Sequence, residues 1–141
     1  MTTTTTTDET TDETTDESAI ATVLADSYRG WAAGDADAMV ADYTEDAIAI
    51  VPGSLRVGRD VIRDSMAAAF AGPLRGTTTV DEQLSIRFLG TDAAVVVTES
   101  GILFPGQSEV PEEARVHATW VLQKRDGRWL IASYHNCRVA A

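Results

Sequence analysis

Three side chains capable of acid–base chemistry lie in the C-terminal half of the sequence: Glu99, Arg115 and His117. An imidazole changes charge near physiological pH, so His117 could shuttle a proton. Glu99 stands inside the apolar run AVVVTESGILF, where desolvation would make its carboxyl group an acid–base candidate. Arg115 could bind a carboxylate or a polarised carbonyl. The three residues together predict general acid–base catalysis without a cofactor.

Each of these residues also has a structural interpretation. His117 fits a hydrogen-bonded wall residue, and Arg115 fits a salt bridge to a surface acid. Glu99 could pair with Arg115 across neighbouring strands, and a bulge near residues 100–101 would change the direction of its side chain. The sequence leaves the choice between catalysis and structure open for all three.

The remaining reactive residue types give weaker signals. The two histidines, His117 and His135, have no acid at ligand spacing, so we expect no metal site. Cys137 has no base near it in the sequence and is expected to be inert. The chain contains no glycine-rich phosphate loop, dinucleotide fingerprint or Ser-His-Asp order, so we expect no cofactor.

Composition narrows the class of protein. The 141 residues suffice for one domain, and 44% of them are hydrophobic. A formal charge of −11 argues against binding to nucleic acid or to an anionic membrane, because both would repel it. A single cysteine allows no disulfide within the chain and fits the reducing cytoplasm. Neither a signal peptide nor an apolar stretch of membrane-spanning length occurs.

Residues 1–17, MTTTTTTDETTDETTDE, form a low-complexity segment. They include six of the 22 acidic residues and almost no apolar side chain. Nothing in this segment would offset the entropy lost on ordering it. We therefore predict a disordered acidic tail over residues 1–17 and a single domain over residues 18–141.

Periodicity predicts helices first and strands last. Apolar residues recur at three- and four-residue spacing after Ser18, up to Gly34, and again after Asp35 and after Gly58. Alternation typical of strands follows. The expected strands cover residues 47–51, 79–89, 93–104, 115–124 and 128–139. This order indicates an α+β fold in which three helices cover one face of a curved, mostly antiparallel sheet.

Three segments carry a family resemblance: WAAGDADAMVADYTEDAIAIVP at 31–52, GRDVI at 58–62 and DGRWLIASYHN at 126–136. With them, residues 20–139 resemble the nuclear-transport-factor-2-like superfamily, which includes ketosteroid isomerase and the SnoaL-like polyketide cyclases. The closest resemblance is to the SgcJ/EcaC group of enediyne polyketide biosynthesis. It implies a cone-shaped fold with an apolar pocket between the first helix and the inner face of the sheet.

The resemblance also allows a test of isomerase chemistry. Ketosteroid isomerase uses a tyrosine, a base aspartate and a protonated aspartic acid. Ser27, Val51 and Thr119 align with those three positions, and none of them can replace the aligned group. The resemblance therefore implies the pocket of that enzyme without its catalytic groups.

Alternation along the strands predicts which residues face this pocket. If Thr119 faces inward, then so do Arg115 and His117. The alignment also directs Leu130, Ala132, Tyr134 and Asn136 inward. The outward set is Val116, Ala118, Trp120, Leu122, Trp129, Ile131 and His135. So many apolar residues on the outer face predict a homodimer formed through the sheet.

These inferences predict an accessory protein of enediyne polyketide biosynthesis that binds a hydrophobic, polyene-like ligand and meets pathway enzymes. The alternatives are a cofactor-free cyclase or isomerase using His117 with Glu99 or Arg115, and a structural assembly domain. Aromatic walls with a few polar groups suit a flat ligand. The expected ligand-binding residues are Ser27, Trp31, Val51, Met66, Phe70, His117, Thr119, Tyr134 and Asn136.

Overall fold

The computed structural model describes the backbone of residues 2–140 and the side chains of residues 14–140. The elements are α1 (Thr2–Ala32), α2 (Ala36–Met39), β1 (Tyr43–Val51), β2 (Ser54–Val57), α3 (Arg59–Ala71), β3 (Thr78–Phe88), β4 (Ala93–Leu103), the 3-10 helix η1 (Glu112–Ala114), β5 (Val116–Arg125) and β6 (Arg128–Arg138).

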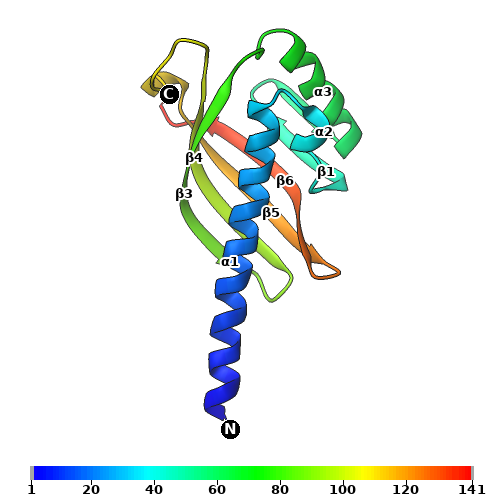
Figure 1. Cartoon of the computed structure of the whole chain (residues 1–141), viewed down its shortest axis with the longest axis vertical. Helices are drawn as coiled ribbons and strands as arrows, with labels where there is room; N and C mark the ends of the chain where they lie inside the picture. The colour runs from blue at the N-terminus through cyan, green and yellow to red at the C-terminus, as the bar shows by residue number, and fades with distance from the viewer. Residues whose placement is uncertain (1, 141) are drawn as a thin grey trace.

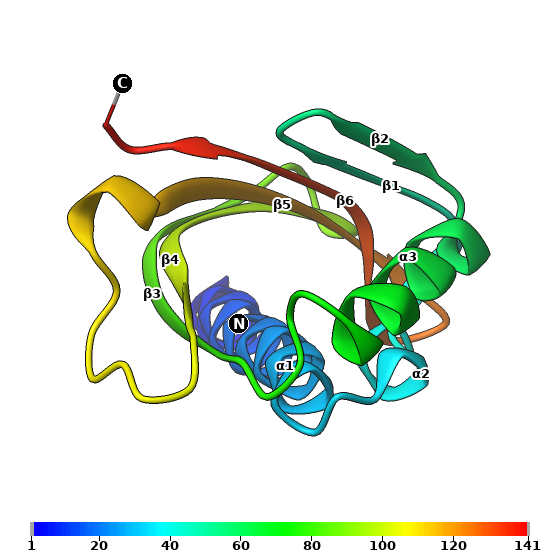
Figure 2. The same ribbon diagram turned by 90° about the horizontal axis from the view of Figure 1, so that it is seen from above.

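The six strands form one curved sheet in the order β2-β1-β6-β5-β4-β3. Neighbouring strands are antiparallel except β1 and β6, which run parallel. The sheet wraps around α1, while α2 and α3 lie beside the β1–β2 end (Figures 1 and 2). The predicted α+β fold, with three helices on a curved, mostly antiparallel sheet, is confirmed.

The N-terminal segment differs from the sequence prediction. Residues 2–17 belong to α1, which crosses the expected boundary between tail and domain and projects beyond the sheet (Figure 1). Asp16 anchors this part of the helix, because its Oδ1 accepts hydrogen bonds from Trp129 Nε1 at 3.0 Å and Lys124 Nζ at 3.1 Å. Adding a residue to an existing helix costs little once a packed segment has nucleated it. The structure thus continues α1 through residues 2–17. The division into a tail over residues 1–17 and a domain over residues 18–141 stays a prediction, and Met1 lies outside the described residues.

Strand β5 has the opposite orientation to the one expected. Ala118, Trp120 and Leu122 are buried on the concave face, whereas His117 is exposed on the convex face. The prediction began from an aligned position, Thr119, and a shift of one residue in a strand moves every side chain to the other face. The inward placement of Arg115, His117 and Thr119 was therefore wrong.

Strand β6 contains a bulge at Ala132. Its neighbours Ile131 and Ser133 pair with Leu122 and Val121, so Ala132 has no partner on β5. The extra residue resets the alternation, and Trp129 and Ile131 lie on the same concave side as Tyr134. The outward placement of Trp129 and Ile131 was wrong for this reason, whereas Tyr134 faces inward as predicted.

Helices α1 and α2 approach each other at Gly30. A Cβ atom on this residue would lie 2.4 Å from the backbone nitrogen of Met39. One turn earlier, Ser27 Oγ donates a hydrogen bond to the Met39 carbonyl at 2.9 Å. Gly30 therefore fixes the separation of the two helices, and Ser27 fixes their register.

We predict that Gly30→Ala destabilises the protein by about 2 kcal/mol or more, because backbone must move to admit the methyl group. Helix propensity alone would predict the opposite sign, a gain of about 1 kcal/mol. Urea unfolding followed by circular dichroism measures the change. Ala25→Gly, at an exposed position inside α1, is the control and should lower stability by about 1 kcal/mol. A Gly30→Ala variant as stable as the wild type would contradict the packing described.

Candidate functional site

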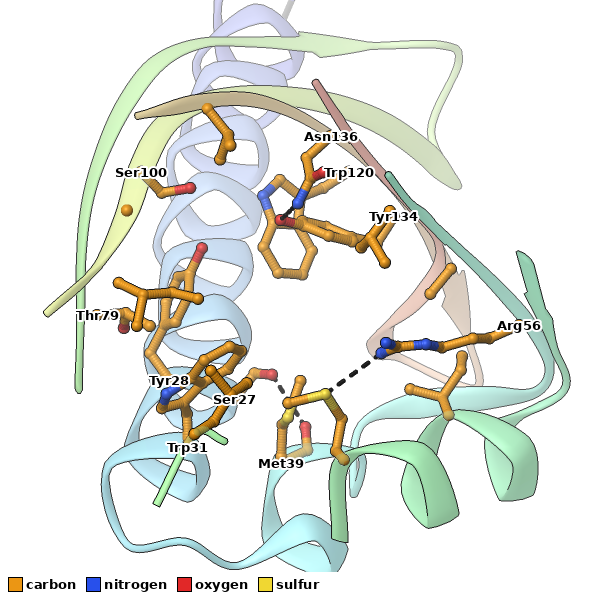
Figure 3. A pocket seen from close by; sticks show the side chains of 18 of the residues that line it. Ser27, Tyr28, Trp31, Met39, Arg56, Thr79, Ser100, Trp120, Tyr134 and Asn136 are labelled. Atoms are coloured by element: carbon orange, nitrogen blue, oxygen red, sulfur yellow. Dashed lines mark hydrogen bonds between the residues drawn. The ribbon is translucent and has the colours of Figure 1, made fainter. Parts of the chain in front are cut away.

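A cavity of about 350 Å³ lies between the concave face of the sheet and the helices (Figure 3). This volume is in the range of small-molecule sites. The lining comes from all three helices and from every strand of the sheet. Most of the lining residues are apolar, and aromatic rings form two of the walls.

Trp31 of α1 forms one aromatic wall. Its indole Nε1 donates to Thr77 Oγ1 at 3.0 Å, and Thr77 Oγ1 in turn donates to the Leu74 carbonyl at 2.7 Å. Phe70 packs edge-on against Trp31 with 5.5 Å between ring centroids. Phe70 is buried behind the wall and is not itself part of the lining. The indole plane is therefore held from two sides.

Trp120 of β5 forms the second wall. Its Nε1 donates to Thr98 Oγ1 at 3.1 Å, a buried hydrogen bond between neighbouring strands. Tyr134 lies 4.4 Å from the Trp120 ring and Tyr28 lies 5.9 Å from it, both measured between centroids. The three rings form one aromatic surface of fixed orientation, which suits a flat apolar ligand.

Polar groups gather at one end of the cavity, where Figure 3 shows Tyr28, Ser100, Tyr134 and Asn136. The Tyr28 hydroxyl donates to Asp81 Oδ1 at 2.9 Å, and Asn136 Nδ2 donates to the Tyr134 hydroxyl at 2.8 Å. The other amide atom of Asn136, Oδ1, is buried and has no partner within the described chain. This end can exchange hydrogen bonds with a polar group on a ligand.

The phenols of the cavity hold their protons. Burial raises the pKa of Tyr28, and the charge of Asp81 adds to the effect. Burial also raises the pKa of Tyr43, against the opposing effects of a Ser27 hydrogen bond and the charge of Arg56. Burial raises the pKa of Tyr134 as well. All three phenols are therefore hydrogen-bonding groups at neutral pH, and none is a base.

Six of the residues predicted to bind ligand line the cavity. They are Ser27, Trp31, Val51, Met66, Tyr134 and Asn136. Phe70 supports Trp31 from behind, whereas Thr119 and His117 lie on the opposite face of the sheet. A ligand-binding role for the nine predicted residues stays a prediction.

The predicted catalytic residues form a cluster on the convex face. Glu99 Oε2 lies 3.1 Å from Arg115 Nη1, and Glu99 Oε1 lies 3.3 Å from His117 Nε2. Thr98 and Ser100, the neighbours of Glu99, are buried on the concave side, so Glu99 points away from the cavity. The pairing of Glu99 with Arg115, the structural alternative, is confirmed. The three residues cannot touch a ligand in the cavity, because the sheet separates them from it.

Tyr28 and Arg56 are two of the lining residues that the sequence analysis did not predict. Tyr28 stands four residues after Leu24 and three before Trp31, so the helical spacing could have indicated it. Arg56 carried no such signal. It lies on β2, a strand of four residues that was not predicted, and it faces inward because it pairs with Ala49.

The chain resembles proteins of known family and structure. The family model described as "SnoaL-like domain" matches residues 20–140. A domain of unknown function with a cystatin-like fold from Nostoc punctiforme PCC 73102 is 27% identical, with a TM-score of 0.83 over 91% of this chain and 80% of its own. No protein among the curated ones matches this chain.

Two further solved structures share the fold at lower identity. An NTF2-like protein with a cystatin-like fold from Novosphingobium aromaticivorans is 18% identical, with a TM-score of 0.83 over 97% of this chain and 90% of its own. A ketosteroid isomerase-like protein from Erwinia carotovora atroseptica is 19% identical, with a TM-score of 0.70 over 88% of this chain and 96% of its own. At these identities the likeness concerns the fold alone.

The described residues contain neither a candidate metal site nor a candidate membrane-spanning helix. No group of three or more His, Cys, Asp or Glu side chains has the geometry to hold a metal ion in that part of the chain. None of the described helices combines the length and the apolar character needed to cross a bilayer.

Desolvation of the Asp81 carboxyl group predicts a pH dependence of stability, against the opposing effect of the Tyr28 hydrogen bond on its pKa. Desolvation raises the pKa of Asp81 above 3.8, so the native protein binds this proton more tightly than the unfolded chain does. Stability from this group is therefore present below pH 3.8 and is lost as pH rises through the native pKa.

Asp81→Asn keeps an acceptor for Tyr28 and removes the ionisation. We expect the free energy of unfolding of this variant, relative to the wild type, to increase as pH rises from 3.8 through the native pKa of Asp81. Urea titrations at a series of pH values measure it. Glu82→Gln, on the other face of β3, controls for the change in net charge. A difference independent of pH would refute the assignment.

Proposed function

The chain belongs to the SnoaL-like domain family, and from this premise we propose that it is a binding protein that holds a hydrophobic small molecule in the cavity. The observation that carries the proposal is the chemistry of the lining. Its titratable groups are phenols with raised pKa values and one arginine. The phenols keep their protons at neutral pH, so they can orient a ligand and cannot accept a proton from it.

The walls indicate the shape of the ligand. Trp31 and the tilted pair of Trp120 and Tyr134 present rings held by hydrogen bonds and packing. A planar or conjugated molecule would cover these faces at little entropic cost, because the rings are already ordered. We propose a polyketide-type intermediate or product as the ligand class. Assignment to an enediyne pathway in the cytoplasm, with an SgcJ/EcaC-type accessory role beside pathway enzymes, rests on the sequence resemblance alone.

A cofactor-free isomerase or cyclase is the alternative. One contact favours it: the Tyr28 hydroxyl at the cavity is hydrogen-bonded to a carboxylate. In this arrangement, however, the phenolic proton points toward Asp81 and away from the ligand. The geometry therefore supports binding better than proton transfer. A structural assembly domain is the third possibility, and it requires no ligand at all.

We also propose that two copies associate through the convex face of the sheet. Ile48 and Ile50 of β1 and Leu55 and Val57 of β2 are exposed there and form an apolar patch. The patch spans β1 and β2, and the polar residues Ser133 and His135 of β6 border it on the same face. The proposed interface is on the outer face of the sheet, as in the sequence prediction. It does not include Trp120 and Trp129, because these residues belong to the core. A second copy is self-complementary to such a patch about a two-fold axis.

Binding is tested with N-phenyl-1-naphthylamine, a neutral, flat probe whose fluorescence rises in apolar sites. We expect saturable binding with one probe per chain and a higher Tm in its presence. Ile102→Trp places an indole in the cavity and should weaken binding by about 10-fold or more. Leu84→Trp, at an exposed position of β3 outside the proposed interface, is the matched control and should leave the affinity unchanged. Failure of the wild type to bind, or equal binding by Ile102→Trp, would refute the proposal.

Association is tested by sedimentation equilibrium. We expect the wild type to be dimeric and Ile50→Lys to be monomeric, because a buried, unpaired lysine would strongly disfavour the interface. Leu89→Lys changes an exposed leucine in the β3–β4 turn and should remain dimeric. A monomeric wild type at high protein concentration would exclude the proposed interface.

A further inference from the structure

Arg56 is the one charged side chain in the described lining of the cavity. It lies on β2, and its guanidinium contacts Met66 of α3. Figure 3 shows the Arg56 side chain extending along the cavity. Its guanidinium makes two hydrogen bonds in the described chain: Nε donates to Ser54 Oγ at 3.2 Å, and Nη1 donates to Met66 Sδ at 3.3 Å. A thioether is a weak acceptor, and a guanidinium has five N–H donors. Most of its donor capacity is therefore unused.

Among the partly buried arginines of the described chain, Arg56 alone has no carboxylate partner. The other arginines without one are exposed: Arg75, Arg87, Arg125 and Arg138. Arg63, Arg115 and Arg128 each pair with a carboxylate within 3.1 Å. The sequence has 22 acidic residues against 11 basic ones, so acidic partners are abundant. Arg56 nevertheless has no acidic partner within 4.0 Å among the described residues. A half-buried cation in apolar surroundings is costly unless an anion compensates it.

We infer that Arg56 is the binding site for the carboxylate of an amphipathic acid, whose apolar body fills the aromatic cavity. A planar guanidinium forms two parallel hydrogen bonds to a carboxylate, which gives orientation as well as affinity. One positive charge matches a monoanion, whereas a dianionic phosphate would remain half compensated. The polar end around Tyr28 and Tyr134 lies across the cavity from Arg56 and takes a neutral hydrogen-bonding group (Figure 3).

This inference rests on the proposed function, because it assigns a charge to the ligand that the cavity holds. It adds two statements that an apolar cavity alone does not predict. The ligand is acidic although the protein itself carries a formal charge of −11. The carboxylate end of the ligand lies at β2 and α3, beside Ser54 and Met66.

The test compares 2-naphthoate with its neutral amide, 2-naphthamide, by isothermal titration calorimetry at pH 7 with the full chain. The two probes have nearly the same size and shape and differ in charge. We expect the wild type to bind 2-naphthoate about 10- to 100-fold more tightly than 2-naphthamide, as for hydrogen bonds to charged groups. 2-Naphthyl phosphate should bind more weakly than 2-naphthoate. Equal affinity for the acid and the amide, or tighter binding of the phosphate, would overturn the inference.

Variants locate the effect. Arg56→Gln should lose the preference for 2-naphthoate and keep its affinity for 2-naphthamide, which also shows that the cavity is intact. Arg56→Lys keeps the charge without the planar fork and should recover part of the preference. Arg87→Gln, an exposed arginine on the convex face, is the matched control and should behave like the wild type. An Arg56→Gln variant that still prefers the acid would overturn the inference.

The two proposals fail in different ways. If 2-naphthamide binds in the cavity and 2-naphthoate binds no more tightly, the result supports the binding function and contradicts the role of Arg56. If neither naphthyl probe binds the wild type and N-phenyl-1-naphthylamine does not bind either, both proposals fall together.

Discussion

The unpaired residue Ala132 in β6 determines how the concave face of the sheet is used. Before it, Trp129 and Ile131 pack into a solid core with α1, and after it Tyr134 and Asn136 border an open cavity. Without the extra residue, alternation would place one of these two pairs on the convex face. One residue therefore lets a single strand serve both the core and the site.

Side chains in the two halves of the concave face are held in place by different interactions. In the solid half, Ile20, Leu122 and Ile131 are fully buried, so shape complementarity supplies the stability. In the hollow half, Trp31 and Trp120 lack packing on one side and are oriented by hydrogen bonds to Thr77 and Thr98. In each case a hydrogen bond to a threonine hydroxyl orients the indole, whereas in a dense core the surrounding side chains would do so.

Charge is distributed unequally between the two faces of the sheet. On the convex face, Glu99 sits between Arg115 and His117, so its carboxylate is compensated within the protein. On the concave face, Arg56 has only a hydroxyl and a thioether as partners in the described chain. The acid–base residues predicted from the sequence contact one another on the convex face, and the charged group that lines the cavity is an arginine on a short strand.

The sequence by itself determined the order and type of most elements, because hydrophobic period and turn residues are local properties. It also placed Ser27, Trp31 and Met66 at the cavity, since helical spacing defines a face from within one segment. It could not determine which face of β5 was buried, because strand alternation has two solutions that only the neighbouring elements distinguish. Tertiary structure alone decided the bulge at Ala132, the isolation of Glu99 from the cavity and the inward direction of Arg56. Each of these depends on pairing between segments distant in the chain, and no local pattern records such pairing.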